Sequence, residues 1–415
     1  MTTDTEITII GGGVHGTHLA IRLLNAGVNR ERLRICDPNG LLANLRRQCM
    51  QCGMTELRSP FVHHIAQDPF SLREFAKQRG RQDEIVASET GGDRPTVSLF
   101  FDHAEWICEQ YSLAALVEST RATALTDNDD HVEITTQNGR HIARWCLLAV
   151  GHRRLNRPAW AAELPSEAPV DHVWDEEFDP GRIDETTTVG VVGGGITAAK
   201  CATTLAQPSR EVRLFARSPF RVKLREAGTD WMHFSRVVDR LHELPSASRE
   251  RAKRVAAARY SGGMPPHVFR RLRRAIEDGQ VDLYRTEITA TTAAGGTVVA
   301  SCRDGTAHCL DRVVCATGFG SPYEGPLFDQ LRTETALAAG YRNAPVLADE
   351  TLRWRREDGT LSRIAVSGAA AQQVLGPFSR NIIGARQAGD CVVGWLQRSE
   401  RKPSRKHVQT DQRDC

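Results

Sequence analysis

Two glycine-rich turns carry the clearest chemistry in the sequence. In the first, Gly11, Gly13 and Gly16 have the spacing G-x-G-x-x-G and follow an apolar run over residues 6–10. In this spacing the first glycine permits a tight turn out of a strand, the second lets a phosphate approach the backbone, and the third lets a helix pack closely on the strand. The N-terminus of that helix offers unpaired N–H groups and the positive end of its dipole to the phosphate. We therefore predict that this turn binds a dinucleotide.

Asp37 supports the same prediction. It ends a second apolar run over residues 33–36, about 20 residues past the last glycine, where an acidic side chain accepts hydrogen bonds from the ribose hydroxyls. Residues 17–25 between the two runs have the apolar periodicity of a helix. His15, inside the turn, is interpreted as a filling side chain without a catalytic role.

The second turn differs from the first where the ribose would lie. Gly193, Gly195 and Ala198 form the permitted variant G-x-G-x-x-A, but the strand that follows leads to Arg217 in place of an acid. A carboxylate would repel a ribose 2′-phosphate, whereas an arginine binds one through two hydrogen bonds. This favours NADPH over NADH at the second turn, with an ordinary surface arginine as the alternative.

The elements around these turns predict an α/β protein with two Rossmann-like domains. Two strand–turn–helix–strand units about 180 residues apart indicate an internal duplication. A helix is expected over residues 102–111, and Asn138-Gly139 between two alternating runs predicts a β-hairpin. An N-terminal unit that binds FAD, with a nicotinamide unit inserted into it, is the usual order in such flavoproteins. The predicted parts are an FAD-binding first part over residues 1–157, a connection over 158–185, an NAD(P)H-binding domain over 186–310, a return to the FAD-binding domain over 311–398 and a disordered polar tail over 399–415.

Composition excludes several classes of protein. A net charge of +3 with no basic stripe in the body of the chain argues against nucleic-acid binding. No stretch approaches the ~18 apolar residues of a membrane helix, and the N-terminus MTTDTE is no secretory signal. The 11 cysteines are odd in number and scattered, so we expect free thiols and a cytoplasmic protein.

Four stretches together resemble the two-dinucleotide flavin monooxygenases, and among these the siderophore-type lysine and ornithine N-hydroxylases. They are GGGVHG with Asp37, MTELRSPFVHHIAQDPFSLREFA over residues 54–76, VSLFFDHAEW over 97–106 and DRVVCATGF over 311–319. The sequence departs from the family at Leu99, where an arginine is common, and after SPF at 218–220, where the family's Asn-Glu pair is missing. A substrate other than lysine or ornithine is therefore left open.

The resemblance implies a mechanism and its participants. NADPH would reduce FAD, dioxygen would add at flavin C4a, and the resulting hydroperoxide would hydroxylate a nitrogen of a small amine or amino acid. Because the cofactor carries this chemistry, the protein needs no nucleophile of its own. The resemblance also implies a homo-oligomer.

Several residues are candidates for the flavin site. Gly376, Pro377 and Asn381, in GPFSRN, are expected to aim a helix N-terminus at the flavin, with a plain helix start as the alternative. Thr317 and Gly318 fit the return of the chain to the FAD. Arg58, His63 and His64 lie in the segment that the family places near the flavin or substrate, with a structural role as the alternative for each. Arg58 and His63 are catalytic candidates together with Asn381, and Arg225 and Glu226 are further candidates.

Two other functions remain open. Cys49 and Cys52 form a CxxC that could be a redox disulfide, which would make the protein a flavin-dependent disulfide or other pyridine-nucleotide reductase. A dinucleotide-binding sensor or scaffold is the third option. A metal site is not expected, because no second CxxC or histidine pair stands at zinc spacing.

Overall fold

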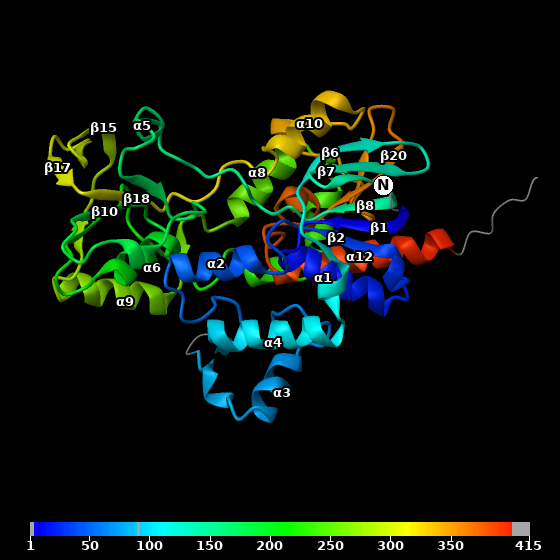
Figure 1. Cartoon of the computed structure of the whole chain (residues 1–415), viewed down its shortest axis with the longest axis horizontal. Helices are drawn as coiled ribbons and strands as arrows, with labels where there is room; N and C mark the ends of the chain where they lie inside the picture. Colours follow the sequence, from blue (N-terminus) through cyan, green and yellow to red (C-terminus); the bar gives the residue numbers. More distant parts are fainter. Residues whose placement is uncertain (1–3, 89–91, 401–415) are drawn as a thin grey trace, which may run out of the picture.

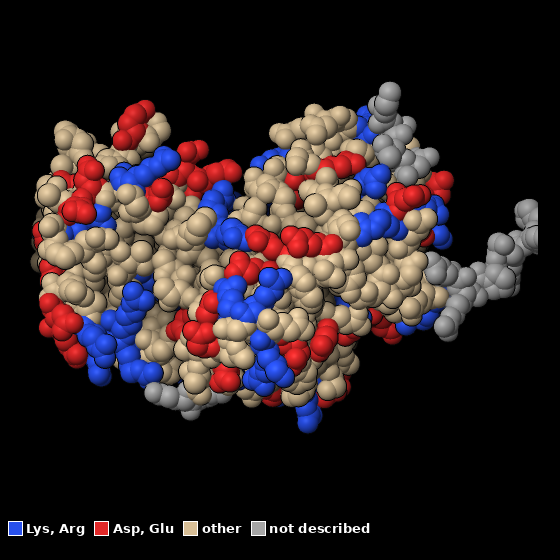
Figure 2. Space-filling view, turned by 60° about the horizontal axis from the view of Figure 1, so that its bottom comes forward, with Lys and Arg blue, Asp and Glu red and all other residues tan. Residues whose placement is uncertain are grey.

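The computed structural model describes residues 4–88 and 92–400 and has two lobes, each built on a largely parallel sheet (Figure 1). The predicted tail lies outside the described residues from 401 onward, while the last helix continues to Glu400. On the face shown in Figure 2, acidic and basic side chains are interspersed, in keeping with the net charge of +3.

The first domain is built on an eight-stranded sheet. Its main order is β19-β20-β8-β1-β2-β5, and β6 and β7 extend it as a meander from β8. The predicted hairpin at Asn138-Gly139 is confirmed, because β7 and β8 pair antiparallel across it. The strands are β1 Asp4–Ile10, β2 Leu33–Cys36, β5 Val117–Glu118, β6 Ala122–Asp127, β7 Val132–Thr136, β8 Gly139–Leu148, β19 Arg353–Arg355 and β20 Leu361–Val366.

Helices cover this sheet on both sides. α1 and α12 pack together (Figure 1), and α3 and α4 project as a helical excursion between β2 and β5. A two-stranded ribbon within the excursion is formed by β3 Ile85–Val86 and β4 Arg94–Pro95. The helices are α1 Val14–Asn25, α2 Ala43–Gln51, α3 Ser71–Gln78, α4 Val97–Gln110, α10 Pro326–Glu334, α11 Gln372–Leu375 and α12 Ile382–Glu400.

The second domain repeats the plan of the first. Its five strands are all parallel, in the order β14-β11-β10-β18-β9, with β10 at the centre as β1 is in the first sheet. The predicted duplication is thus present in the fold. The strands of the sheet are β9 Val170–His172, β10 Val189–Val192, β11 Val212–Phe215, β14 Asp282–Tyr284 and β18 Arg312–Cys315.

Smaller elements complete the second domain. An antiparallel meander, β15 Ile288–Ala294, β16 Thr297–Cys302 and β17 Ala307–Leu310, leads into β18. A two-stranded ribbon joins β12 Arg221–Val222 to β13 Gly263–Met264. The helices are α5 Ala159–Ala162, α6 Ile196–Leu205, α7 Phe234–Val237, α8 Arg249–Ala258 and α9 Pro266–Glu277.

The boundary of the second domain differs from the prediction. The sequence predicts that the return begins at residue 311, but β18 pairs with β10, with Val313 opposite Gly190. β9 also belongs to this sheet, although it lies in the predicted connection. Val313 and Val314 are fully buried, and a central parallel strand of this kind needs neighbours on both sides. The prediction for residues 311–315 is therefore wrong, and the return begins after Cys315.

Two linkers join the domains side by side. Leu155 and Phe319 form an antiparallel bridge, and the N–H of Asn156 donates to the carbonyl of Gly318 at 2.9 Å. The ring of Phe319 stacks on that of His152, with 5.1 Å between the ring centroids. The ring of Trp174 is also stacked with that of Phe319, with 6.4 Å between the centroids. Hydrogen bonds and stacked rings thus fix the chain where it crosses between domains.

A buried ion pair docks the inserted segment on the first domain. Arg251 of α8 is 1% exposed and donates two hydrogen bonds to Asp349, at 2.5 and 2.7 Å. It also donates to the carbonyl of Gln373 at 3.2 Å. Asp349 and Gln373 both belong to the return, so this segment packs against the second part of the FAD-binding domain.

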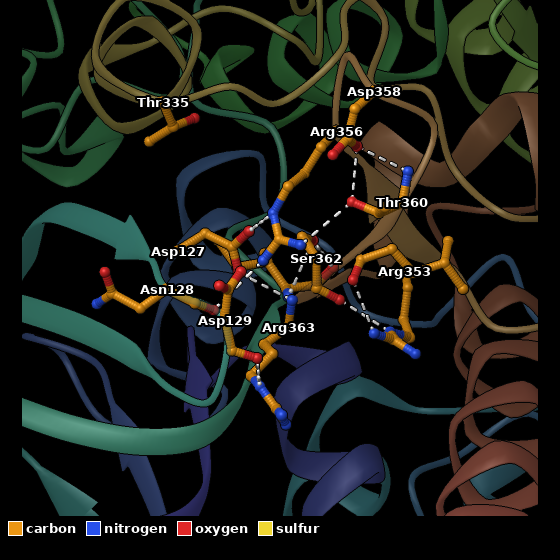
Figure 3. A network of polar contacts seen from close by, with 12 residues as sticks. Asp127, Asn128, Asp129, Thr335, Arg353, Arg356, Asp358, Thr360, Ser362 and Arg363 are labelled. Atoms are coloured by element: carbon orange, nitrogen blue, oxygen red, sulfur yellow. Dashed lines mark hydrogen bonds and ion pairs between the residues drawn. The ribbon is translucent and has the colours of Figure 1, made fainter.

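A second network fixes the return hairpin to the meander of the first sheet (Figure 3). The carboxylate of Asp127 in β6 accepts from Nε of Arg356 at 2.7 Å and from the N–H of Arg363 at 2.9 Å. Its side chain is only 3% exposed, so both oxygens need these partners. The contacts hold β19 and β20 in register beside β8.

Candidate functional site

In the first glycine turn, close packing explains why Gly11 and Gly16 are glycines, whereas Gly13 has open space beside it. A Cβ on Gly16 would lie 1.7 Å from the carbonyl oxygen of Gly11, and Gly11 has φ +110° with its own Cβ position 2.5 Å from the oxygen of Ala149. Gly13, by contrast, has no atom within 4 Å of its Cβ position. It is also the N-cap of α1 and makes no side-chain cap. The space at Gly13 and the free N–H groups of α1 fit a diphosphate.

Asp37 is held in place beside this turn. Its carboxylate accepts from the N–H of Gly12 at 2.7 Å and from the N–H of Asn39 at 2.8 Å. A pocket opens next to it, at the ends of β1 and β2. Its lining includes Gly11, Pro38, Thr120, Arg121, Val150, Gly151 and Arg153. Asp37 and this pocket fit the adenosine end of FAD.

His15 connects the first turn to the return of the chain. Its Nδ1 lies 2.7 Å from Oγ of Ser367, directly after β20. The side chain is buried, and burial lowers its pKa to about 3, so the ring is neutral. The filling role expected for His15 describes its burial, but the bond to Ser367 gives it a positioning role that the local sequence does not reveal.

The segment GPFSRN ends at the N-terminus of α12. The N–H of Ile383 donates to Oδ1 of Asn381 at 3.1 Å, and the carbonyl of Asn381 accepts from Ala385, so Asn381 caps the helix. Gly376 has φ +74°, and the carbonyl of Pro377 accepts from Arg259 at 2.8 Å. The helix start predicted here is present, and the backbone of Asn381 lies beside His15 of the first glycine turn.

A second pocket lies against this helix start, where three parts of the chain meet. The helical excursion, the segment after β12 and the return all contribute to it. Its lining is Arg58, Ser59, Pro60, His63, Arg94, Leu224, Arg225, Glu226, Met232, Phe378, Asn381 and Ile383. The structure thus brings together the three catalytic candidates Arg58, His63 and Asn381.

The two candidates from the excursion are fixed differently. Nε and Nη2 of Arg58 donate to the carbonyls of Leu224 and Lys223, each at 3.0 Å, and so tie the two domains together. Burial lowers the pKa of His63 to about 4, and nearby Arg386 and Arg225 lower it further, so its ring is neutral. His64 lies outside the pocket: it is fully buried and packs edge-on against His103.

The second glycine turn has the same architecture as the first. Gly193 has φ +150°, with its Cβ position 2.6 Å from the oxygen of Ala316, and Ala198 packs beneath it at 3.0 Å. The Cβ position of Gly195 meets only Gly262, at 3.5 Å. The loop around Gly262 therefore lies over the N-terminus of α6. Open backbone at this helix start fits a second dinucleotide.

Arg217 lies at the end of β11, where a ribose phosphate would be read. Its side chain is 74% exposed and pairs with Glu287 at 3.2 Å. Arg303 pairs with the same carboxylate at 2.5 Å. The position suits the predicted role, and a 2′-phosphate would compete with Glu287 for Arg217.

Thr317 and Gly318 belong to the second linker. The hydroxyl of Thr317 donates to the carbonyl of Asn156, and the amide of Asn156 donates to the carbonyl of Thr317 at 3.2 Å. Their contacts among the described residues are thus with the other linker, which leaves their role in cofactor binding a prediction.

The cysteine pair has a structural environment. Cys49 and Cys52 are free and almost fully buried, and burial raises their pKa values to about 12 and about 11. Cys52 lies in the core of the second domain, while Cys49 lies in that of the first. Protonated, buried thiols are poor nucleophiles, so this geometry does not favour a redox disulfide.

Two buried arginines near Glu226, Arg259 and Arg380, escaped the sequence analysis. Burial lowers the pKa of Arg259 to about 9, and repulsion from Arg380 lowers it further. Burial also lowers the pKa of Arg380, and Glu226 opposes both shifts. They come from segments over 100 residues apart, so only the pattern GPFSRN hinted at one of them.

Two further observations concern the described residues as a whole. Across residues 4–88 and 92–400, no three His, Cys, Asp or Glu side chains gather as a metal site would require. None of the helices in the same ranges is long and apolar enough to cross a membrane.

Comparison with known proteins supports the first domain directly. Residues 8–153 match a family model described as FAD-NAD(P)-binding. No curated protein matches the chain.

Solved structures show the fold. An ornithine N-hydroxylase of Kutzneria sp. 744, solved with reduced FAD, NADP⁺ and L-ornithine, is 18% identical, with a TM-score of 0.77 over 96% of this chain and 100% of that one. An L-lysine 6-monooxygenase of Pseudomonas syringae is 17% identical, with a TM-score of 0.73 over 95% and 99%. A bacillithiol disulfide reductase of Bacillus cereus is 16% identical and covers 96% and 100%, with a lower TM-score of 0.61.

These likenesses confirm the predicted fold class. Both glycine turns follow central strands of largely parallel sheets, and the match to the ornithine N-hydroxylase spans both domains. The chain therefore contains an FAD/NAD(P)-binding domain and has the two-dinucleotide fold of the ornithine and lysine hydroxylating monooxygenases.

Proposed function

We propose that the chain is an FAD-dependent, NADPH-using monooxygenase that hydroxylates a nitrogen of a small amine or amino acid with dioxygen. One observation carries the proposal: the pocket that holds Arg58, His63 and Asn381 lies where the N-terminus of α12 meets the second domain. A flavin at that helix start would face both a nicotinamide from the second domain and a substrate in the pocket.

The chain's own residues would bind and orient the participants. Gly13 and the N-terminus of α1 would hold the FAD diphosphate, and Asp37 the ribose. Gly193, Gly195, Ala198 and Arg217 would hold NADPH. When bound, FAD supplies hydride acceptance and the activation of oxygen.

The positive end of α12, capped by Asn381, would stabilise negative charge on the flavin pyrimidine. Neutral His63 can accept a hydrogen bond from a protonated amine at the edge of the pocket. Met232, Phe378 and Ile383 give the pocket apolar walls that exclude water from the reacting nitrogen.

The first test is anaerobic reduction of the FAD-loaded protein by NADPH and by NADH, followed by oxygen and a panel of amines. We expect faster bleaching with NADPH and formation of a hydroxylamine that consumes NADPH in equal amount. Bleaching followed by hydrogen peroxide alone, with every amine recovered unchanged, would instead favour a reductase.

The setting of the enzyme is also part of the proposal. The ten cysteines of the described residues are all free, as thiols are in a reducing compartment. We place the enzyme in the cytoplasm on this ground and expect it to form a homo-oligomer.

A further inference from the structure

The pocket beside Asn381 carries an excess of positive charge. Three guanidinium groups, from Arg58, Arg94 and Arg225, and one carboxylate, from Glu226, line it. His63 adds no charge, because burial lowers its pKa to about 4. Which of the three arginines is already neutralised decides what kind of substrate the pocket accepts.

Arg94 is neutralised within the protein. Its Nη2 pairs with Oε2 of Glu56 at 3.2 Å, and Nε2 of His267 lies 3.2 Å from the other oxygen of the same carboxylate. Arg94 is also buried. This pair therefore forms a wall of the pocket and is balanced without a ligand.

Arg58 and Arg225 have no such partner. Arg58 donates to two backbone carbonyls, which orient its guanidinium without cancelling the charge. Arg225 is half-buried and makes no hydrogen bond or ion pair among the residues that the structure describes. Both guanidinium groups come from segments that meet at the mouth of the pocket between the domains.

Glu226 is already shared among several cations. It raises the pKa of Arg58, of Arg259 and of Arg380, in each case against the lowering by burial. It forms no close ion pair in the described part of the chain. Because Arg259 and Arg380 also draw on Glu226, this one carboxylate does not neutralise both Arg58 and Arg225.

The remaining charged group near the pocket does not change this balance. Arg386 of α12 lies near His63, and Asp390 and Asp68 lie near Arg386. Its charge is thus opposed by carboxylates outside the pocket. Within the pocket, the carboxylate of Glu226 stands against the guanidinium groups of Arg58 and Arg225, which leaves an excess of positive charge that an anion would neutralise.

We propose that the substrate is an acidic amine, whose anionic group is held by Arg58 and Arg225, and that the pocket disfavours diamines and basic amino acids. This inference rests on the proposed N-hydroxylation. A guanidinium group binds a carboxylate or a phosphate through charge-assisted hydrogen bonds, and a half-buried pocket strengthens the attraction relative to water. Met232, Phe378 and Ile383 would contact the alkyl part, and the nitrogen would lie toward Asn381.

The test measures binding without turnover. Calorimetry on the protein loaded with FAD and NADP⁺ would compare matched probes: 5-aminopentanoate, an aminoalkyl phosphate of equal length, pentylamine and 1,5-diaminopentane, together with L-glutamate against L-lysine. We expect the acids to bind at least tenfold more tightly than pentylamine, and the diamine to bind most weakly. The stronger of the carboxylate and phosphate arms identifies the anionic group.

Variants assign the preference to this pocket. Arg225→Gln should lower the affinity for the acidic probes at least tenfold and reduce their advantage over pentylamine, with FAD content and thermal midpoint reporting whether the variant folds. Arg221→Gln is the matched control, because Arg221 is an exposed arginine on β12 that does not line the pocket. It should leave all affinities unchanged.

Two outcomes separate this inference from the proposed function. Tight binding of acids without any hydroxylamine would support the inference and contradict the monooxygenase. Hydroxylation of L-lysine or 1,5-diaminopentane, with either bound as tightly as its acidic counterpart, would support the monooxygenase and overturn the inference.

Discussion

The Nδ1 atom of His15 lies 2.7 Å from Oγ of Ser367, although 352 residues separate them. The pair joins the first glycine turn to the end of β20, and the next residue, Gly368, has φ +84°, a left-handed conformation that favours glycine. The two halves of the FAD-binding domain therefore meet through a buried polar contact at the expected diphosphate site.

Removing the hydroxyl should weaken both the fold and the retention of FAD. Ser367→Ala leaves a buried imidazole nitrogen unpaired, which costs about 1–3 kcal/mol of the free energy of unfolding. It also frees the glycine turn, so we expect a higher Kd for FAD in a fluorescence titration.

The control is Ser362→Ala in β20, the strand that Ser367 follows. Ser362 is fully buried and exchanges hydrogen bonds with Ile364, at 3.1 and 3.2 Å, away from the turn. It should lose stability on urea unfolding while FAD affinity stays constant. Equal FAD affinity in both variants would show that the bond from His15 has no part in cofactor binding.

The glycines of the first turn should separate folding from binding. Gly16→Ala places a Cβ 1.7 Å from a backbone oxygen, so we expect failure to fold. Gly13→Ala meets no protein atom within 4 Å and has φ −70°, which alanine adopts freely. We expect that the Gly13→Ala apoprotein unfolds within about 1 kcal/mol of the parent but binds little FAD. Full FAD content in the Gly13→Ala variant would show that the diphosphate binds at another place.

Local patterns were sufficient to predict the two turns, Asp37 and the hairpin. Each depends on residues close in sequence: a strand, a glycine spacing and the next strand. The start of α4 could also have been found, since Thr96 caps it by accepting from Leu99 at 3.1 Å, yet the predicted helix begins only at residue 102.

Features that depend on distant pairing could not be predicted. The place of β18 beside β10 is decided by burial between strands 120 residues apart, and a four-residue apolar run does not specify its neighbour. The same limit applies to the pocket, where Arg58, Arg225 and Asn381 come from three separate segments. The sequence therefore indicated candidates, while their grouping needed the fold.

The CxxC pair should be dispensable for electron transfer. The double variant Cys49→Ala/Cys52→Ala removes two buried, protonated thiols. We expect a lower melting temperature from lost packing, about 0.5–3 kcal/mol per site, but unchanged NADPH oxidation per bound FAD in stopped-flow. Loss of steady-state NADPH oxidation in a variant with normal FAD content would instead support the function of a disulfide reductase.

Buried histidines should make the fold sensitive to acid. Burial lowers the pKa of His64 to about 3 and of His103 to about 4, from 6.5. Because the pKa of each histidine is lower in the folded state than in the unfolded state, protons bind preferentially to the unfolded state. The stability that the two neutral rings contribute is therefore complete above pH 6.5 and is lost as the pH falls toward 4. At pH 5 each costs about 2 kcal/mol of the free energy of unfolding.

His103→Gln should remove one of these two losses of stability in acid. We expect urea unfolding at pH 5 and pH 7 to differ by about 2 kcal/mol less than in the parent. His233→Gln, at an exposed position, is the control and should retain the parent's acid loss. An identical acid loss in the His103 variant would mean that this histidine does not drive acid unfolding.

Arg217 should decide between the two nicotinamide cofactors. If its guanidinium leaves Glu287 to bind the 2′-phosphate, Arg217→Ala should raise the Kd of NADPH roughly tenfold to a hundredfold, the loss of a charged hydrogen bond. The Kd of NADH should stay constant, because NADH has no phosphate there. Arg303→Ala is the matched control, since Arg303 is 73% exposed and pairs with the same Glu287. Equal effects of the two substitutions, or an equal loss for both cofactors, would assign Arg217 to the stability of this ion-pair cluster and leave the preference for NADPH to other residues.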